Sequence, residues 1–233
     1  MIYDRRIYKA KLQESLQGKS GAKLQRKGNR IHKVASNTLE SALWYKKAKG
    51  MVNVPMVYEI CGDTMILEYI QSTEEPDVDS ILDIVLTKFY GTVIECPDFQ
   101  SYVDRIDNHV FEQGIDRRYQ KAFVDNTDLY HDSMFKTFCH GDLSIDNVIS
   151  NKGVLYFIDP NYLPEVWSSW VLDISKLCMS LVRFKKDRVT NKETESKEMK
   201  AMELSHWIRF YKYTDDKKTC LEEMEKLYNV IND

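Results

Sequence analysis

The sequence has few of the features that mark several large classes of protein. It contains no apolar run near the length needed to cross a bilayer, so it predicts no membrane span. Its five cysteines are dispersed and form no Cys-x-x-Cys pair, which argues against a disulfide framework and against a zinc site. The formal net charge is only −3 and the basic residues are spread along the chain, so we expect no nucleic-acid partner.

Two further absences bear on where the protein acts. The first residues lack the continuous apolar core of a secretory signal. The cysteines are dispersed and odd in number, which favours a reducing compartment, so the expected location is the cytoplasm. There is no internal repeat and no low-complexity tract. With 233 residues, 43% of them hydrophobic and 30% charged, the chain is long enough for a globular enzyme of two lobes. Nothing in the sequence predicts an oligomeric state.

What the chain does contain is a group of polar residues that suits phosphoryl transfer. Residues 138–149 read FCHGDLSIDNVI, and Asp159 follows twelve positions after Asn147. Transfer of a phosphoryl group to a hydroxyl needs a carboxylate that orients the acceptor and takes its proton, and oxygen ligands for magnesium. Asp142 is the candidate for the first role, and Asn147 and Asp159 are the candidate magnesium ligands.

The residues between Asn147 and Asp159 predict a β-hairpin. Two apolar runs, 148–150 and 154–158, flank a three-residue turn that contains Gly153. Such a hairpin would return the chain so that Asp159 faces the same metal ions as the preceding loop.

At this point the sequence resembles the aminoglycoside phosphotransferase and choline kinase superfamily, the small-molecule branch of the protein-kinase-like fold. The family pattern is His-Gly-Asp-Leu, three free positions, Asn, a hairpin and Ile-Asp. The matching residues are His140, Gly141, Asp142, Leu143, Asn147, Ile158 and Asp159. A second landmark, an aspartate at the start of a later helix, is matched by Asp173.

The resemblance implies an α+β fold of two lobes that binds ATP and Mg²⁺. A small antiparallel β N-lobe would comprise residues 1–71, and a mainly helical C-lobe residues 72–233. His140 would orient the catalytic loop by hydrogen bonds rather than exchange protons. Cys139, its neighbour, is expected to lie in the core, because adjacent residues of an extended chain point to opposite faces.

The resemblance also assigns nucleotide-binding residues to the N-lobe. Lys33 would bind the α- and β-phosphates and pair with a glutamate of the next helix, where Glu40 is the only carboxylate. Backbone groups near Glu68 and Ile70 would hydrogen-bond the adenine edge. The turn at 17–21, with two glycines, is either a phosphate-covering loop or an ordinary hairpin loop.

Patterning predicts the secondary structure of both lobes. Strands are expected at 7–15, 22–27, 30–35, 57–60 and 64–70, with one helix at 37–49. Further helices are expected at 78–90 and 99–111, after Asp173, and near 202–213 and 219–231.

The acceptor is expected to be a small molecule. A protein kinase carries a long activation loop and an Ala-Pro-Glu element after its metal-binding aspartate, whereas only residues 160–172 separate Asp159 from Asp173 here, without that element. Gly141 also replaces the arginine of the protein-kinase His-Arg-Asp motif. We therefore predict transfer of the γ-phosphoryl group of ATP to a hydroxyl of an aminoglycoside, of choline or ethanolamine, or of a sugar-like compound.

Several alternatives stay open at the level of sequence. One is a pseudokinase that serves as a nucleotide-binding or interaction module, and another is the same fold moving a nucleotidyl group or acting on a protein side chain. Three aromatic residues after Asp159 belong either to the acceptor site or to the core: Tyr162, Trp167 and Trp170. Three acidic residues are candidates for binding a polycationic acceptor: Asp146, Glu165 and Asp173.

Overall fold

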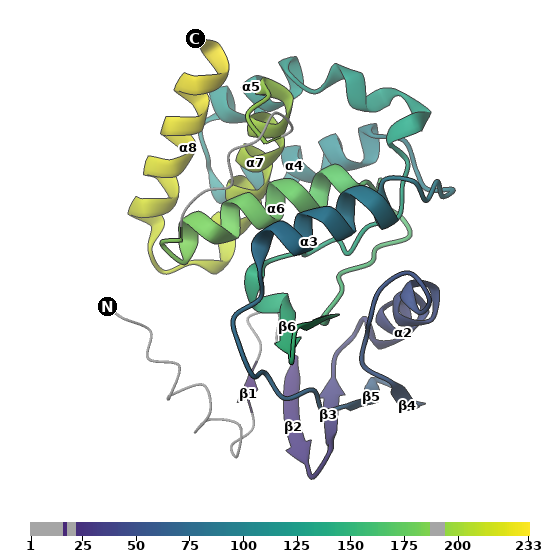
Figure 1. The fold of residues 1–233 in the computed structure, drawn as a ribbon. Helices are drawn as coiled ribbons and strands as arrows, with labels where there is room; N and C mark the ends of the chain where they lie inside the picture. Colours follow the sequence, from purple (N-terminus) through teal and green to yellow (C-terminus); the bar gives the residue numbers. More distant parts are fainter. Residues whose placement is uncertain (1–15, 18–21, 187–193) are drawn as a thin grey trace. The chain divides into compact units, whose positions relative to one another are not determined.

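The computed structural model describes residues 16–17, 22–186 and 194–233, and the chain divides into two compact units (Figure 1). The first unit comprises residues up to Pro76 together with Val148–Asn161, and the second comprises Asp77–Asn147 and Tyr162–Asp233. The strand predicted at 7–15 and most of the turn at 17–21 lie outside the described residues. The predicted lobe boundary between residues 71 and 72 stays a prediction.

The first unit contains an antiparallel sheet of five strands in the order β1-β2-β3-β5-β4. The strands are β1 (Leu16–Gln17), β2 (Lys23–Lys27), β3 (Arg30–Val34), β4 (Val57–Cys61) and β5 (Thr64–Glu68). β3 lies between β2 and β5, with Lys33 opposite Leu24 on one side and Met65 on the other. Gly28 and Gly62, in the two tight turns, have φ of 59° and 55°, which glycine adopts without a steric penalty.

One helix, α2 (Thr38–Ala48), follows β3 in the first unit. The Thr38 hydroxyl donates to the carbonyl oxygens of Ala35 at 2.6 Å and of Asp63 at 2.8 Å. These bonds fasten the start of α2 to the turn between β4 and β5. The helix predicted at 37–49 is thus confirmed to within a residue or two.

The predicted hairpin is present as β6 (Val148–Asn151) and β7 (Val154–Phe157). Its turn has two residues rather than the three that we expected, because Asn151 still pairs with Val154. Lys152 and Gly153 have φ of 52° and 77°, as a two-residue hairpin turn that matches the twist of its strands requires. Glu74 Oε1 accepts hydrogen bonds from Ser150 Oγ at 2.8 Å and from Gly153 N at 2.5 Å. These bonds hold the hairpin against the segment just before Pro76.

The second unit is mainly helical. Its longer helices are α3 (Val78–Ile84), continued as the π-helix η1 (Val85–Phe89), α4 (Gln100–Gln113), α5 (Arg117–Asp125), α6 (Trp170–Arg183), α7 (Lys197–Phe210) and α8 (Lys217–Asn232). Short 3₁₀ turns are η2 (Asp128–His131), η3 (Ser133–Phe135), η4 (Ile145–Asn147) and η5 (Tyr211–Tyr213). The expected helices are confirmed, whereas α5 was not predicted, because its nine residues offer too short a periodic pattern.

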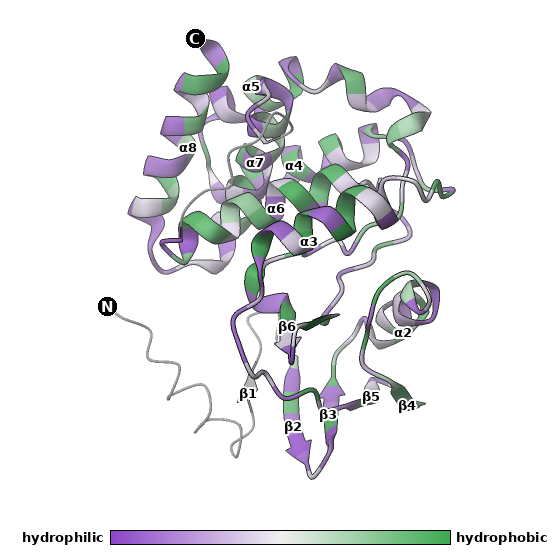
Figure 2. Ribbon diagram, viewed as in Figure 1, coloured by the Kyte–Doolittle hydropathy of each residue, from purple (hydrophilic) through white to green (hydrophobic). Residues whose placement is uncertain are grey.

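Helix α6 is the buried centre of the second unit. Nearly all of its first twelve residues are buried, and Figure 2 shows it as mostly hydrophobic, whereas α8 alternates between hydrophilic and hydrophobic residues. Helix α8 therefore covers the core with one face only. Within the part of the chain that the structure describes, no helix is both long and apolar enough to cross a bilayer. The α+β fold predicted from the sequence is confirmed.

Candidate active site

The loop that carries the predicted catalytic residues is fixed by a buried carboxylate. In the second unit, Asp173 in the first turn of α6 accepts the backbone N–H of His140 at 2.6 Å and that of Gly141 at 2.9 Å. Gly141 has φ of 79°, a conformation that favours glycine. The backbone immediately before Asp142 is thereby held at two successive positions.

Asp173 itself has an unusual ionisation. Burial raises the pKa of this carboxyl to about 8, although the two N–H donors oppose the rise. Asp173 has no exposed surface, so its carboxyl oxygens accept hydrogen bonds from the loop backbone and not from solvent. The position of Asp173 matches the family landmark noted in the sequence, and its side chain holds the backbone of the loop in place.

Asp142 and Asn147 lie together at the two ends of this loop. The Asn147 side-chain amide donates to the Asp142 carbonyl oxygen at 2.8 Å and approaches Asp142 Oδ2 at 3.4 Å. The Asn147 Oδ1 atom forms no hydrogen bond to any residue that the structure describes. Asn147 therefore uses its nitrogen to hold the loop and leaves an oxygen that suits a hard cation such as Mg²⁺.

Sequence reasoning missed the partner of Asp142. Lys176 Nζ lies 3.1 Å from Asp142 Oδ1 and comes from α6, one turn after Asp173. The spacing of three residues from Asp173 places both side chains on one face of the helix, and this was the signal available in the sequence.

Lys176 sets the charge of Asp142. Burial raises the pKa of the Asp142 carboxyl, but Lys176, with smaller contributions from Arg209 and His140, more than compensates and leaves it below the ordinary value. The carboxylate is ionised at neutral pH, as a group that takes a proton from an acceptor hydroxyl must be.

The residues that precede Asp142 belong to the core. His140 has no exposed surface, and its backbone N–H holds the loop through Asp173. Cys139 is buried next to Ser168, and burial raises the pKa of its thiol well above the ordinary value. The expected core position of Cys139 is confirmed.

In the first unit, Lys33 and Asp159 form the second lysine–aspartate pair. Lys33 on β3 is only 4% exposed, and its Nζ lies 2.5 Å from Asp159 Oδ1. Asp159 follows β7 with φ of 56°, and its backbone N–H donates to Tyr45 Oη of α2 at 3.0 Å. A left-handed conformation at a non-glycine residue is strained and is typical of functional positions. The Asp159 side chain is still 51% exposed, so it retains oxygen surface for a cation.

Glu40 does not pair with Lys33 in the described structure. Its Oε2 atom is buried and has no hydrogen-bond partner among the residues described, while Lys33 is engaged by Asp159. A buried carboxylate oxygen without a partner is costly and calls for a cation. The Lys33–Glu40 pair stays a prediction.

The residues predicted to meet the adenine lie at the end of β5. The Glu68 N–H donates to the Met56 carbonyl oxygen at 2.8 Å, and Glu68 Oε2 accepts the Met56 N–H at 3.2 Å. Ile70 is buried, and within the described part of the chain its N–H donates no hydrogen bond. Ile70 thus retains a backbone donor for a ligand, which is the feature its predicted role requires.

The aromatic residues after Asp159 divide between core and surface. Trp167 is buried against Phe99, at 4.8 Å between ring centroids, and Trp170 is buried against Tyr90, at 5.4 Å. Of the two interpretations left open, the core one holds for both tryptophans. Tyr162 is half-buried.

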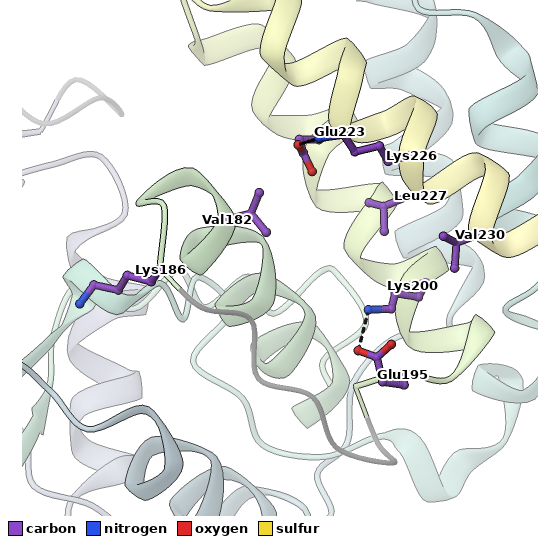
Figure 3. A pocket seen from close by; sticks show the side chains of 8 residues that line it. All are labelled: Val182, Lys186, Glu195, Lys200, Glu223, Lys226, Leu227 and Val230. Carbon is purple, nitrogen blue, oxygen red and sulfur yellow. Dashed lines mark hydrogen bonds and ion pairs between the residues drawn. The ribbon is translucent and has the colours of Figure 1, made fainter. Parts of the chain in front are cut away.

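A pocket of about 470 Å³ lies elsewhere in the second unit, among α6, α7 and α8 (Figure 3). It is lined by Val182, Lys186, Glu195, Lys200, Glu223, Lys226, Leu227 and Val230. Among these lining residues, Lys200 pairs with the adjacent Glu195 at 3.1 Å. None of the residues predicted from the kinase motif lines this pocket.

The fold was compared with known proteins. No protein-family model matches the chain, and no curated protein matches its sequence. Solved structures do match. Choline kinase LicA from Streptococcus pneumoniae is 17% identical, with a TM-score of 0.61 over 97% of this chain and 98% of that one. The ADP-bound aminoglycoside phosphotransferase APH(2'')-Ib is 13% identical, with a TM-score of 0.57 over 97% of each chain. A choline/ethanolamine kinase family protein from Mesorhizobium loti is 12% identical, with a TM-score of 0.55 over 98% of this chain and 94% of that one.

The chain has a protein-kinase-like fold. The resemblance inferred from the motif residues is confirmed at the level of fold, over nearly the whole length of both chains. At such low identity the likeness carries the architecture alone, so the activity rests on the residues described above.

Proposed function

We propose that the protein is a small-molecule kinase that transfers the γ-phosphoryl group of ATP to a hydroxyl of a small acceptor. One observation carries the proposal: the loop of the second unit holds Asp142 as an ionised carboxylate, fixed through Asp173 and bonded to Asn147. This is the arrangement that phosphoryl transfer to an alcohol needs, in a fold shared with proteins named as choline and aminoglycoside kinases.

Each predicted residue has a role in the proposed reaction. Asp142 orients the acceptor hydroxyl and accepts its proton, while the acceptor oxygen forms a bond to the γ-phosphorus and the bond from that phosphorus to the β–γ bridging oxygen breaks, giving ADP. Lys33 binds the nucleotide phosphates. Most of the acceleration comes from positioning and from neutralised charge, without a covalent intermediate.

The nucleotide and metal assignments follow the motif. The Ile70 N–H and the backbone of Glu68 would bind the adenine edge, and Glu40 would support Lys33. Asn147 and Asp159 would supply oxygen ligands to Mg²⁺, which neutralises the phosphate charge when it is bound. The spacing of the motif supports the joint metal site, and the free Asn147 Oδ1 and the exposed Asp159 carboxylate fit it. All five cysteines are unpaired, which supports a reducing compartment such as the cytoplasm.

A small acceptor is favoured over a protein. The segment from Pro160 to Ser169, between Asp159 and the start of α6, is too short for the platform on which protein kinases bind a peptide. The acceptors printed in the names of the similar structures are small molecules as well.

The test is phosphate transfer from Mg-ATP, resolved by mass, to a panel of hydroxy acids, sugars, sugar acids, nucleosides, choline, ethanolamine and aminoglycosides. A phosphorylated product formed by the parent protein and not by Asp142→Asn supports the proposal. Binding of Mg-ATP without any product would instead favour the nucleotide-binding module, the alternative to which the unpaired Glu40 oxygen lends support.

A further inference from the structure

Two cationic side chains of the second unit, Lys176 and Arg209, act on Asp142, and a third, Arg105, interacts with Arg209. Helix α7 is fixed to α6 by His206, whose Nε2 lies 3.0 Å from the Leu172 carbonyl oxygen and 3.1 Å from Ser175 Oγ. Arg209 follows His206 by one turn, and Lys176 follows Ser175 directly. The charge of Arg209 lowers the pKa of both Asp142 and Lys176, so Arg209 lies near that pair.

Helix α4 adds the third cation. Tyr102 Oη lies 2.9 Å from Ser205 Oγ, which fixes α4 to α7. Arg105 follows Tyr102 by one turn, and the guanidinium carbon of Arg209 lies 5.9 Å from the centroid of the Tyr102 ring. Arg105, Lys176 and Arg209 are called the cationic cluster below.

The two arginines of the cluster form no ion pair with a carboxylate in the described part of the chain. Arg209 Nε is buried and has no hydrogen-bond partner there. Other arginines of the same unit are paired, Arg118 with Glu225 at 2.5 Å and Arg183 with Asp146 at 3.2 Å. Burial lowers the pKa of Arg209, but Tyr102 and then the charge of Asp142 more than compensate and raise it, so this guanidinium stays charged. A charged, half-buried guanidinium group without an ion pair is suited to bind an anion.

Electrostatic effects agree that Arg209 lies near both Arg105 and Lys176. Burial, and then the charge of Arg209, lower the pKa of Arg105 to about 10. Burial also lowers the pKa of Lys176, and Arg209 adds to this effect. Burial and the charges of Arg209 and Arg105 lower the pKa of His109 on α4 to about 4, so His109 is neutral at pH 7.

Two of the three acidic residues that a polycationic acceptor would need are already engaged by other groups. Asp146 pairs with Arg183, and Asp173 accepts two backbone N–H groups in the core. Glu165 is exposed, and its charge raises the pKa of Arg105. Lys212, the next cation along α7 and η5, pairs with Glu112 at 3.4 Å. Of the carboxylates beside the cluster in the described structure, Asp142 pairs with Lys176, and Glu165 lies exposed at the surface.

We propose that the acceptor is an anionic alcohol, a small molecule whose carboxylate or phosphate group is bound by Arg105 and Arg209 while its hydroxyl is presented to Asp142. The proposal rests on the kinase function argued above. It excludes choline and the aminoglycosides as acceptors, because their positive charges would face the cationic cluster. The bonds made and broken are those of the proposed reaction, since the anionic group of the acceptor takes no part in them.

Two matched sets of probes test the proposal by binding and by transfer. The first is glucuronate, glucose and glucosamine, and the second is 3-phosphoglycerate, glycerol and ethanolamine. Each set has one anion, one neutral compound and one cation. Isothermal titration in the presence of Mg-ADP measures binding without turnover, and mass-resolved assays with Mg-ATP measure transfer. At least one anion should bind more tightly than both of its counterparts and be phosphorylated.

The variants are Arg105→Gln and Arg209→Gln, with Arg117→Gln as the matched control. Arg117 is an exposed arginine at the start of α5 with no part in the cluster. A charge-assisted contact is lost in the first two variants, so the dissociation constant of the anion should rise about tenfold to a hundredfold, and binding of the neutral probe should not change. Arg105→Gln keeps the test decisive if Arg209→Gln does not fold.

The outcomes separate this proposal from the one on which it rests. Tighter binding of an amine, no binding by either anion, or equal effects of Arg105→Gln and Arg117→Gln would overturn it. A rise in the KM for Mg-ATP with no change in acceptor binding would assign the arginines to the nucleotide phosphates and overturn it too. Binding of the anion without transfer to any compound would refute the kinase function and leave the anion site standing.

Discussion

Each of the two units carries one lysine–aspartate pair among its candidate functional residues, and the pairs are held in different ways. In the first unit, Lys33 is buried in a sheet, and its partner Asp159 is strained and half exposed. In the second unit, Asp142 lies on a loop whose backbone donates two hydrogen bonds to the buried Asp173. Its partner Lys176 comes from the buried helix α6. In the first pair, a buried lysine lies beside a carboxylate that solvent can reach. In the second pair, the carboxylate lies on a loop held in place by hydrogen bonds, and its pKa is lowered by the neighbouring lysine.

The difference corresponds to two chemical tasks. A nucleotide phosphate needs a cation in a fixed place and an oxygen ligand that a metal ion can reach, and the first pair offers both. An acceptor hydroxyl needs a carboxylate of defined position and charge, and the second pair offers that. Substitutions should therefore separate the two pairs by their effects on nucleotide and on acceptor.

Asp142→Asn should have the largest effect. The amide cannot accept the acceptor proton, so turnover should fall by roughly 10²- to 10⁴-fold while the affinity for Mg-ATP stays nearly unchanged. Asp146→Asn is the matched control, because Asp146 lies four residues away and pairs with Arg183 at the surface. Steady-state kinetics and nucleotide titration measure the two quantities, and turnover retained by Asp142→Asn would remove this residue from the proposed role.

Lys33→Ala should act on the nucleotide instead. Loss of a charge-assisted contact to phosphate should raise the KM for Mg-ATP by about tenfold to a hundredfold and leave the KM for the acceptor unchanged. The half-exposed Asp159 can be solvated once its partner is removed, so the fold should tolerate the change. Lys27→Ala, at an exposed position of β2, controls for the loss of a lysine. Equal KM values for ATP in the two variants would contradict the assignment.

Asp173→Asn should test the support beneath the second pair. A protonated Asp173 and the asparagine side chain each carry a donor beside an acceptor oxygen, so the substitution should change the free energy of unfolding little near pH 4. The pKa of Asp173 in the folded protein, about 8, lies above the usual value of about 3.9. The stability contributed by its protonated form is therefore fully present below pH 4 and is lost as the pH rises toward 8.

Urea unfolding at pH 5, 6, 7 and 8 measures this dependence. The parent protein should lose stability with rising pH by up to about 1.4 kcal/mol per unit from this group, and Asp173→Asn should lack that component. Asp146→Asn should keep it. Parallel pH profiles for the parent and Asp173→Asn would show that the carboxyl titrates normally.

The architecture and the motif residues could be predicted from the sequence because both depend on patterns among residues that are close together in the chain. Alternation gave the strands, apolar periodicity gave the longer helices, and fixed spacings identified His140, Asp142, Asn147 and Asp159. Asp142 and Asn147 are brought together within their unit, as are Lys33 and Asp159 within theirs.

What could not be predicted depends on contacts between distant segments. Lys176 reaches Asp142 from a helix 34 positions further along the chain, and Glu74 holds a hairpin that begins 74 positions later. Arg105 and Arg209 lie on separate helices, and no spacing rule relates them. The tryptophans at 167 and 170 are core residues for the same reason, since their burial is decided by helices that pack over them.

Lys176→Met should have the smallest effect and sharpens the comparison most. It removes the main charge that lowers the pKa of Asp142, so that the remaining effect of burial raises this pKa. In the proposed reaction turnover requires ionised Asp142 and is lost as the pH falls. The acid limb of the pH–rate profile should therefore move up by roughly one unit, with little change above pH 8. Lys121→Met removes a comparable lysine–aspartate pair from the surface of α5 and should leave the profile unmoved. An unmoved acid limb in Lys176→Met as well would show that the loop and Asp173, rather than the lysine, set the charge of the catalytic carboxylate.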